Sequence, residues 1–229
     1  MADKILKLTN IMEHLKPHTI FFLGPIPFSS TVVNAWVIMA LLFALVLATT
    51  RNLELVPSGW QHLPEMFIEF IYDLLDSVIG REGRQFLPLV GTLFIFILFL
   101  NLAWFIPGMK PPTMDLSTTA AFGFVTMIAV QLIGIRKKGL ANYLKGFLAP
   151  TPILAPLNLI EELIKPVSLS LRLFGNMFGE EMVVVILFTL APLFAPIPVQ
   201  MLGIIMASIQ AFVFTLLTTT YISAMLQGH

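Results

Sequence analysis

The chain has 229 residues, of which 57% are hydrophobic and only 11% are charged. Soluble domains carry roughly 25% charged residues, so this composition indicates an integral membrane protein. The 13 basic and 13 acidic residues cancel, which favours neither nucleic-acid binding nor a polybasic membrane surface. With no cysteine and four scattered histidines, the chain lacks the usual residues for disulfides and metal sites, and we expect no cofactor.

The chain starts with an N-terminal segment, residues 1–31. Its beginning, MADKILKLTNIMEHLKP, lacks the short apolar run and small-residue cleavage site of a secretory signal peptide. The first span follows at residues 32–50, where VVNAWVIMALLFALVLATT contains no charged residue. This stretch is long enough to cross a bilayer core of ~30 Å. The spans themselves are therefore expected to direct insertion.

Residues 64–80 differ in kind from the spans. Acidic residues recur there every three or four positions, and apolar residues fill the other face; the acidic set is Glu65, Glu69, Asp73 and Asp76. This pattern predicts an amphipathic helix that lies at the membrane interface. Because its polar face is acidic, we expect it to dock on another protein rather than on anionic lipid.

Two further charge-free stretches predict the second span at residues 88–106 and the third, more weakly apolar span at residues 116–135. The loop after the third span is the most basic in the protein and contains Arg136, Lys137, Lys138 and Lys145. By the positive-inside rule this loop is cytoplasmic. The N-terminus is then expected outside the cell and the C-terminus in the cytoplasm.

Residues 157–191 and 199–226 predict two long helices, separated by the proline-rich stretch APLFAPIPV. At ~1.5 Å per residue the first helix would be roughly 50 Å long, whereas a perpendicular span needs about 20 residues. The two helices are therefore expected to form a strongly tilted hairpin. The predicted fold is one all-α integral membrane domain, residues 1–229, with about five membrane-embedded helices plus the interfacial helix.

The first long helix carries polar side chains along one face. At about 100° per residue, one narrow stripe holds Glu161, Lys165, Ser168, Arg172 and Asn176. Glu180 lies at the edge of this stripe, and Glu181 projects to the other side. The residues Glu161, Glu162 and Lys165 fit either a simple ion-pair set at i,i+3 and i,i+4 spacing or a functional role.

Arg172 is harder to explain as a simple structural residue. Placing arginine in mid-membrane costs a few kcal/mol, so such a residue faces a polar cavity or a charged partner. Glu180 and Glu181 lie roughly 12–14 Å away along the axis, too far for a direct pair. We therefore expect Arg172 to meet an acid from another protein.

Several motifs resemble subunit a of F-type ATP synthases. RLFGN, preceded by PVSLSL and followed by a glutamate, is similar to the signature of that family. FLNLAWFIPG, PPTMDLSTTAAF and IQAFVFTLLTTTYIS are similar to further family stretches. The resemblance covers most of the chain beyond about Asn52, and it implies a non-catalytic subunit of a H⁺-transporting two-sector ATPase in the bacterial inner membrane.

The resemblance also implies roles for individual residues. Arg172 would face the ion-carrying carboxylate of the rotating c-ring, with Gln210 beside it from the neighbouring helix and Tyr221 on the same face as Gln210. Asn176 and Glu181 would line the outer half-channel, with Asp115 near its mouth and Glu180 next to the relay. The cytoplasmic half-channel would be surrounded by Glu161, Glu162, Lys165 and Ser168. The implied partners are the c-ring, b-type peripheral stalk subunits and membrane lipid, without nucleic acid.

Two departures from the family pattern and two rival functions accompany this hypothesis. One departure is the pair of adjacent glutamates, because Glu180 either shares the relay with Glu181 or simply faces the subunit or water. Many relatives carry a histidine near Gly203 or Glu181, whereas this chain has none between His62 and His229. A secondary transporter or channel would need polar residues in several spans, and the first two spans offer almost none. A non-conducting scaffold is disfavoured by Arg172 and the glutamates. The chain also lacks a P-loop for binding ATP.

Overall fold

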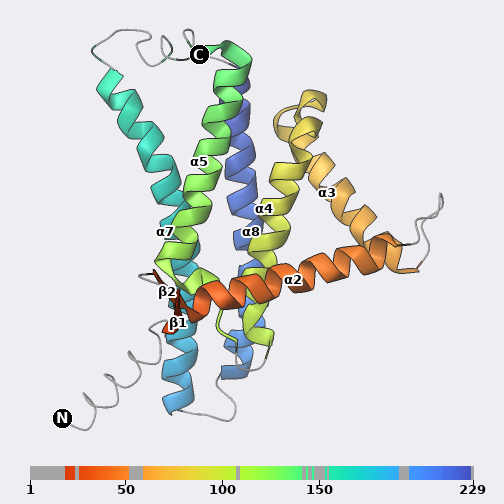
Figure 1. The fold of residues 1–229 in the computed structure, drawn as a ribbon, viewed down its shortest axis with the longest axis vertical. Helices are drawn as coiled ribbons and strands as arrows, with labels where there is room; N and C mark the ends of the chain where they lie inside the picture. The colour runs from red at the N-terminus through yellow and green to blue at the C-terminus, as the bar shows by residue number, and fades with distance from the viewer. Residues whose placement is uncertain are drawn as a thin grey trace.

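The computed structural model describes residues 19–23, 26–51, 59–106, 109–140, 143, 146, 153, 155–190 and 196–227. Within these ranges the fold is all-α apart from one short β-hairpin (Figure 1). In this hairpin β1 (Thr19–Leu23) pairs antiparallel with β2 (Ile26–Ser29). The sequence had indicated no strand in the N-terminal segment. Most of this segment lies outside the described residues, and so does Lys145 of the basic loop.

In the described part of the chain, six long helices follow the hairpin. Their bounds are α2 Ser30–Thr50, α3 His62–Val78, α4 Leu87–Asn101, α5 Leu116–Lys138, α7 Ala155–Leu190 and α8 Pro196–Gln227. Short 3-10 helices flank them at Gly59–Gln61, Arg81–Phe86, Leu102–Phe105 and Pro112–Met114. The predicted second span thus ends its α-helical part at Asn101 and continues as 3-10 helix.

Local sequence signals explain where several helices begin and end. Asp115 caps α5, because its carboxylate accepts a hydrogen bond from the Ser117 backbone N–H at 3.1 Å. The last turn of α5 is basic, which suits the negative end of the helix dipole. Gly139 follows with φ 77°, and Gly80 follows α3 with φ 88°. Both glycines combine a positive φ with an extended ψ, −174° at Gly80 and 150° at Gly139, a backbone conformation that is essentially restricted to glycine.

Helices α4, α5, α7 and α8 run side by side and form the core of the molecule (Figure 1). The buried Asn101 of α4 donates to the Ala207 carbonyl of α8 at 3.3 Å. Helix α5 approaches α7 closely at Gly123, where a Cβ atom would come within 2.6 Å of the Pro166 carbonyl oxygen. The C-terminal ends of α5 and α8 lie at the same end of this bundle, since Met225 packs against Gly134.

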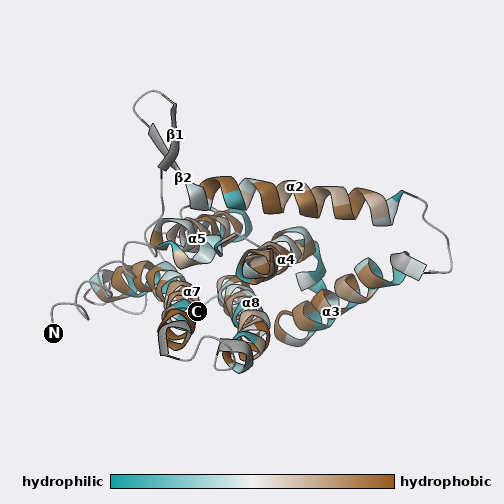
Figure 2. Cartoon of the chain, turned by 90° about the horizontal axis from the view of Figure 1, so that it is seen from below, coloured by the Kyte–Doolittle hydropathy of each residue, from teal (hydrophilic) through white to brown (hydrophobic). Residues whose placement is uncertain are grey.

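Helix α2 crosses the bundle steeply on one side, and its exposed surface is largely apolar (Figures 1 and 2). Only Thr31, Ile38 and Leu42 are buried, and Ile38 and Leu42 pack against Leu100 and Ala103. Its 21 residues correspond to ~31 Å, the thickness of one bilayer core. Because α2 and the bundle cross at a steep angle, their axes cannot both follow the membrane normal.

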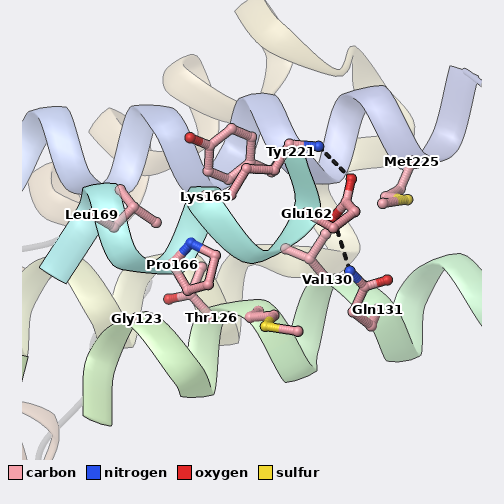
Figure 3. Close-up of a pocket in the computed structure, with 11 residues that line it drawn as sticks. Gly123, Thr126, Val130, Gln131, Glu162, Lys165, Pro166, Leu169, Tyr221 and Met225 are labelled. Carbon is pink, nitrogen blue, oxygen red and sulfur yellow. Dashed lines mark hydrogen bonds and ion pairs between the residues drawn. The ribbon is translucent and has the colours of Figure 1, made fainter. Parts of the chain in front are cut away.

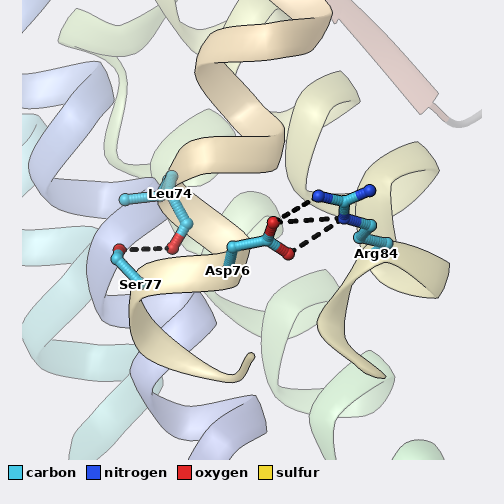
Figure 4. A network of polar contacts seen from close by, with 4 residues as sticks. All are labelled: Leu74, Asp76, Ser77 and Arg84. Carbon is cyan, nitrogen blue, oxygen red and sulfur yellow. Dashed lines mark hydrogen bonds and ion pairs between the residues drawn. The ribbon is translucent and has the colours of Figure 1, made fainter. Parts of the chain in front are cut away.

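The predicted amphipathic helix is α3, which lies beside α4 and α8 (Figure 2). Its buried face consists of Ile71, Leu74 and Leu75, which pack against Val90, Val130 and Ile222. On the exposed side, Asp76 accepts three hydrogen bonds from the Arg84 guanidinium, at 3.0, 3.2 and 2.5 Å (Figure 4). These hydrogen bonds hold the pKa of the Asp76 carboxyl below its ordinary value.

Among the described residues, four helical stretches are long and apolar enough to cross a membrane: Ser30–Thr50, Arg81–Phe105, Leu116–Lys138 and Pro198–Leu226. The fifth long helix, α7, differs because it carries Glu161, Glu162, Lys165, Arg172, Glu180 and Glu181. Its partner in the hairpin, α8, carries no charged residue at all. The acidic and basic side chains of the hairpin therefore all belong to α7.

Candidate functional site: the polar face of the long hairpin

Arg172 lies on the exposed side of α7, next to Leu171, which is 52% exposed. Within the described part of the chain, its guanidinium makes no ion pair and no hydrogen bond. The following residue, Leu173, is fully buried against the rest of the bundle. The helix is thus anchored by its apolar face while it presents a permanent positive charge outward.

Asn176, one turn beyond Arg172, connects α7 with α8. Its amide nitrogen Nδ2 donates to Oε1 of Gln210 at 2.5 Å. Gln210 is only 3% exposed, and its own Nε2 finds no partner among the described residues. The structure therefore joins Gln210 of α8 to Asn176 of α7 through a hydrogen bond.

A cavity of about 220 Å³ opens farther along α7, lined by Glu180 and Glu181 together with Gln200 of α8. Although the two glutamates are adjacent in sequence and were expected to diverge, both reach this one cavity. The Glu180 carboxylate rests on Gly203, where any side chain would collide with it. Volume of this size accommodates several water molecules, since each occupies about 30 Å³ in the liquid.

Lys110 places a positive charge near Glu181. This lysine lies within electrostatic reach of the Glu181 carboxylate, and its neighbours Met109 and Pro111 line the same cavity. Its backbone carbonyl accepts a hydrogen bond from Asn34 of α2 at 3.1 Å. Sequence distance concealed this contact, because Lys110 stands in the loop between α4 and α5.

Asp115 lies near the same loop and links two elements. Its Oδ2 accepts from the Thr31 hydroxyl of α2 at 3.0 Å, while its Oδ1 caps α5. It does not belong to the residues that line the cavity beside Glu181. Asp115 thus connects α2 with α5, near the loop that contains Lys110.

The four residues near the start of α7 divide into two pairs. Glu161 and Ser168 are exposed, and the Glu161 side chain is 69% accessible. Glu162 and Lys165 are turned inward, with side chains only 14% and 22% accessible, and form an ion pair (Figure 3). Lys165 also lies 3.5 Å from the Glu161 carboxylate. The ion-pair interpretation of these residues is therefore correct as a description of the local contacts.

Tyr221 and two residues not identified from the sequence complete this end of the site. The Lys165 ammonium lies over the Tyr221 ring, 5.6 Å from its centre. Gln131 of α5 donates from Nε2 to Oε2 of Glu162 at 2.9 Å. Burial, and then the nearby Glu162 charge, raise the pKa of Tyr143. In the sequence, Gln131 is a polar residue within the weakly apolar third span. No local pattern predicts its contact with Glu162, which lies 31 positions farther along the chain.

Comparison with known proteins gives one consistent result. A family model described as ATP synthase A chain matches residues 32–223. The chain is 64% identical over 218 residues to ATP synthase subunit a of Moorella thermoacetica, which covers 95% of this chain and 100% of that protein. It is 45% identical over 200 residues to ATP synthase subunit a 1 of Syntrophotalea carbinolica, covering 86% and 85% of the two chains. A similar protein of Trichlorobacter lovleyi is 44% identical over 203 residues, covering 87% and 88%.

Proposed function

This chain belongs to the ATP synthase A chain family, and on that premise we propose that it is the stator subunit through which protons cross the membrane sector of a bacterial ATP synthase. In this function it couples proton flow to rotation of a c-ring, while ATP itself is made elsewhere in the complex. The chain is then a non-catalytic subunit of a rotary motor.

The single observation that carries the proposal is the outward position of the unpaired Arg172. A permanently charged side chain on an apolar helix requires an acidic partner or a polar cavity, and the described part of this chain supplies no acid in contact with it. We assign the partner as a carboxylate on a c-ring subunit. Each ring carboxylate would be neutral while it faces lipid and ionised while it faces Arg172.

Simple electrostatics shows why arginine suits this task. Its pKa lies above 12, so it stays protonated throughout the cycle. At ~4 Å and an effective dielectric of about 20, it attracts a carboxylate by ~4 kcal/mol. This attraction favours release of the proton from the ring carboxylate, yet it is weak enough for the rotor to move on. The fixed positive charge also bars protons from passing directly between the two half-channels.

The two half-channels use opposite ends of α7. On the outer side, we place Glu180 and Glu181 in their common cavity, with Asn176 and Gln210 between this cavity and Arg172. Asp115 stands near the outer mouth. On the cytoplasmic side, Glu161 and Ser168 are exposed to the channel, while Glu162, Lys165 and Tyr221 form its rear wall. The offset between the two ends requires the ring to turn before a proton can leave.

The orientation in the membrane follows from α2 and the basic loop. Because α2 is one bilayer crossing in length, the helices that cross it steeply would run inclined to the membrane normal. The basic end of α5 would face the cytoplasm, together with the C-terminal end of α8. The acidic side of α3 would then provide a docking surface for a protein partner such as a b-type peripheral stalk subunit.

Replacing Arg172 tests this function directly. The complex with Arg172→Ala should assemble, because the change removes the desolvation cost of a charge, but it should make no ATP. Arg172→Lys should restore little activity, since an ammonium lacks the planar fork of a guanidinium and loses its proton more readily when buried. The measurement is ATP synthesis driven by an imposed proton gradient, with c-ring co-purification as the check on assembly.

The matched control is Leu171→Ala, which truncates an exposed neighbour without changing charge. It should retain most of the wild-type rate. Substantial ATP synthesis by fully assembled Arg172→Ala complexes would refute the proposed role of this residue.

A further inference from the structure

The cavity of about 220 Å³ beside α7, here called the outer cavity, is lined by several oxygen-bearing side chains. Glu180 and Glu181 contribute carboxylates, and Gln200 contributes an amide. Carboxylate and amide oxygens are the ligands that hard cations such as Ca²⁺ prefer, and Ca²⁺ takes roughly six to eight oxygens, water included. A metal cation held there would occupy the carboxylates that a proton path needs.

Lys110 supplies a positive charge that opposes cation binding in the outer cavity. Its ammonium acts electrostatically on the Glu181 carboxylate, and the charge of Glu181 acts in turn on Glu180. Met109 and Pro111, the residues on either side of Lys110, both line the cavity. The loop that carries the lysine is therefore part of the cavity wall.

The backbone at Lys110 is held in place from more than one side. Its carbonyl oxygen accepts a hydrogen bond from Asn34 Nδ2 of α2 at 3.1 Å. The 3-10 helix that follows, Pro112–Met114, is buried and packs against α7. A lysine on such a backbone cannot leave the cavity as a dissolved counter-ion would. Its ammonium therefore accompanies the two carboxylates permanently.

We propose that Lys110 excludes metal cations from the outer cavity and so keeps Glu180 and Glu181 free for protons. This inference rests on the proposed function, and it gives Lys110 a part in ion specificity. Coulomb repulsion scales with charge, so one ammonium repels a divalent cation about twice as strongly as a proton. A proton also forms an O–H bond with a carboxylate, whereas Ca²⁺ depends on charge and on several oxygen ligands. The fixed ammonium therefore discriminates against the metal.

A purely structural alternative makes the opposite prediction. A lysine near the membrane surface commonly extends its ammonium toward the lipid headgroups. In that case a neutral side chain at position 110 would leave the affinity of the outer cavity for cations unchanged. The calcium sensitivity of neutral variants therefore separates the two roles.

The test uses gradient-driven ATP synthesis by the intact complex, in vesicles whose outward-facing side is the cytoplasmic one. The outer cavity then opens to the lumen, where CaCl₂ or choline chloride of equal ionic strength is enclosed, while the nucleotides stay outside. Each rate is divided by the rate of the same variant without Ca²⁺. Lys110→Met and Lys110→Gln should be half-inhibited at a Ca²⁺ concentration at least about tenfold lower than the wild type requires.

Two controls separate charge from shape. Lys110→Arg keeps the positive charge and should retain the calcium resistance of the wild type. Met109→Leu alters a neighbouring side chain of the lining without changing charge, and it should retain that resistance too. Assembly is checked by c-ring co-purification, and the two neutral variants keep the test decisive when one of them fails to assemble. Equal calcium sensitivity in the wild type and the neutral variants, or an equal loss of resistance in Lys110→Arg, would overturn the inference.

The density of the intact complex in Ca²⁺ gives a readout that does not depend on proton flow. The Lys110→Met map should show an ion peak about 2.3–2.6 Å from a carboxylate oxygen of Glu180 or Glu181, and the wild-type map should show none. A peak in the wild type, or an empty cavity in the variant, would contradict exclusion by Lys110. Failure of the proposed function would appear differently, as persisting ATP synthesis in assembled Arg172→Ala complexes.

Discussion

The carboxylate of Glu180 on α7 rests directly against Gly203 on α8, so that a Cβ atom at position 203 would come within 1.6 Å of Glu180 Oε1. Only glycine leaves room for the carboxylate in this place. Glu180 itself lines the cavity that Glu181 also lines. The absence of a side chain at position 203 therefore decides where one of the two glutamates points.

Gly203→Ala should displace the Glu180 carboxylate and slow proton delivery from the outer side, with little loss of thermal stability. The stability cost is small because the colliding atoms are the mobile end of a side chain. Proton uptake by reconstituted vesicles measures the first effect and thermal unfolding the second. In a Glu180→Ala background the collision disappears, so Gly203→Ala should then have no additional effect. Equal effects in both backgrounds would contradict this explanation.

Glu181→Gln should slow proton uptake more than Glu180→Gln does. Glutamine cannot bind and release a proton at neutral pH, and the resemblance places Glu181 at the family's outer-channel position. The nearby Lys110 provides Glu181 with a compensating charge. The two variants are matched controls for each other, because they remove one charge each from the same cavity. Near-normal rates in both would show that neither glutamate is an obligatory relay.

Gly123→Ala should weaken the packing of α5 on α7. The added Cβ would approach Ser170 Oγ to 2.2 Å and the Pro166 carbonyl oxygen to 2.6 Å, and the second contact cannot be relieved by a side-chain rotation. Overpacking of this kind costs typically ~1–3 kcal/mol, so the thermal midpoint of the complex should fall. Gly175→Ala is the control, because its Cβ would meet nothing within 4 Å. An unchanged midpoint for Gly123→Ala would mean that the two helices are less tightly joined.

Single cysteines in this cysteine-free chain should report the orientation of α5. Lys138→Cys at the basic end should react with an impermeant thiol reagent from the cytoplasmic side, and Ser117→Cys should react from the outside. Thr113, an obvious choice in the preceding loop, is unsuitable because it is fully buried, whereas Ser117 is exposed. Labelling of both cysteines from one side would exclude the proposed topology.

The hydrophobic spans, the amphipathic helix and the charged stripe of α7 were all accessible from the sequence. Apolar length and the 3.6-residue period depend on neighbours within a few turns, so they can be read along the chain. The period places Ser168, Arg172 and Asn176 on one face of α7. The family resemblance likewise rests on contiguous motifs such as RLFGN.

The tertiary structure decided which distant residues meet. Gln131 reaches Glu162 across 31 positions, and Lys110 approaches Glu181 from a loop between two other helices. The packing of the helices also turned Glu162 and Lys165 inward and left Glu161 exposed, although all three residues lie within two adjacent turns of α7. Such differences depend on how α5, α7 and α8 pack, because local periodicity specifies the face of a helix but not the partner that covers it.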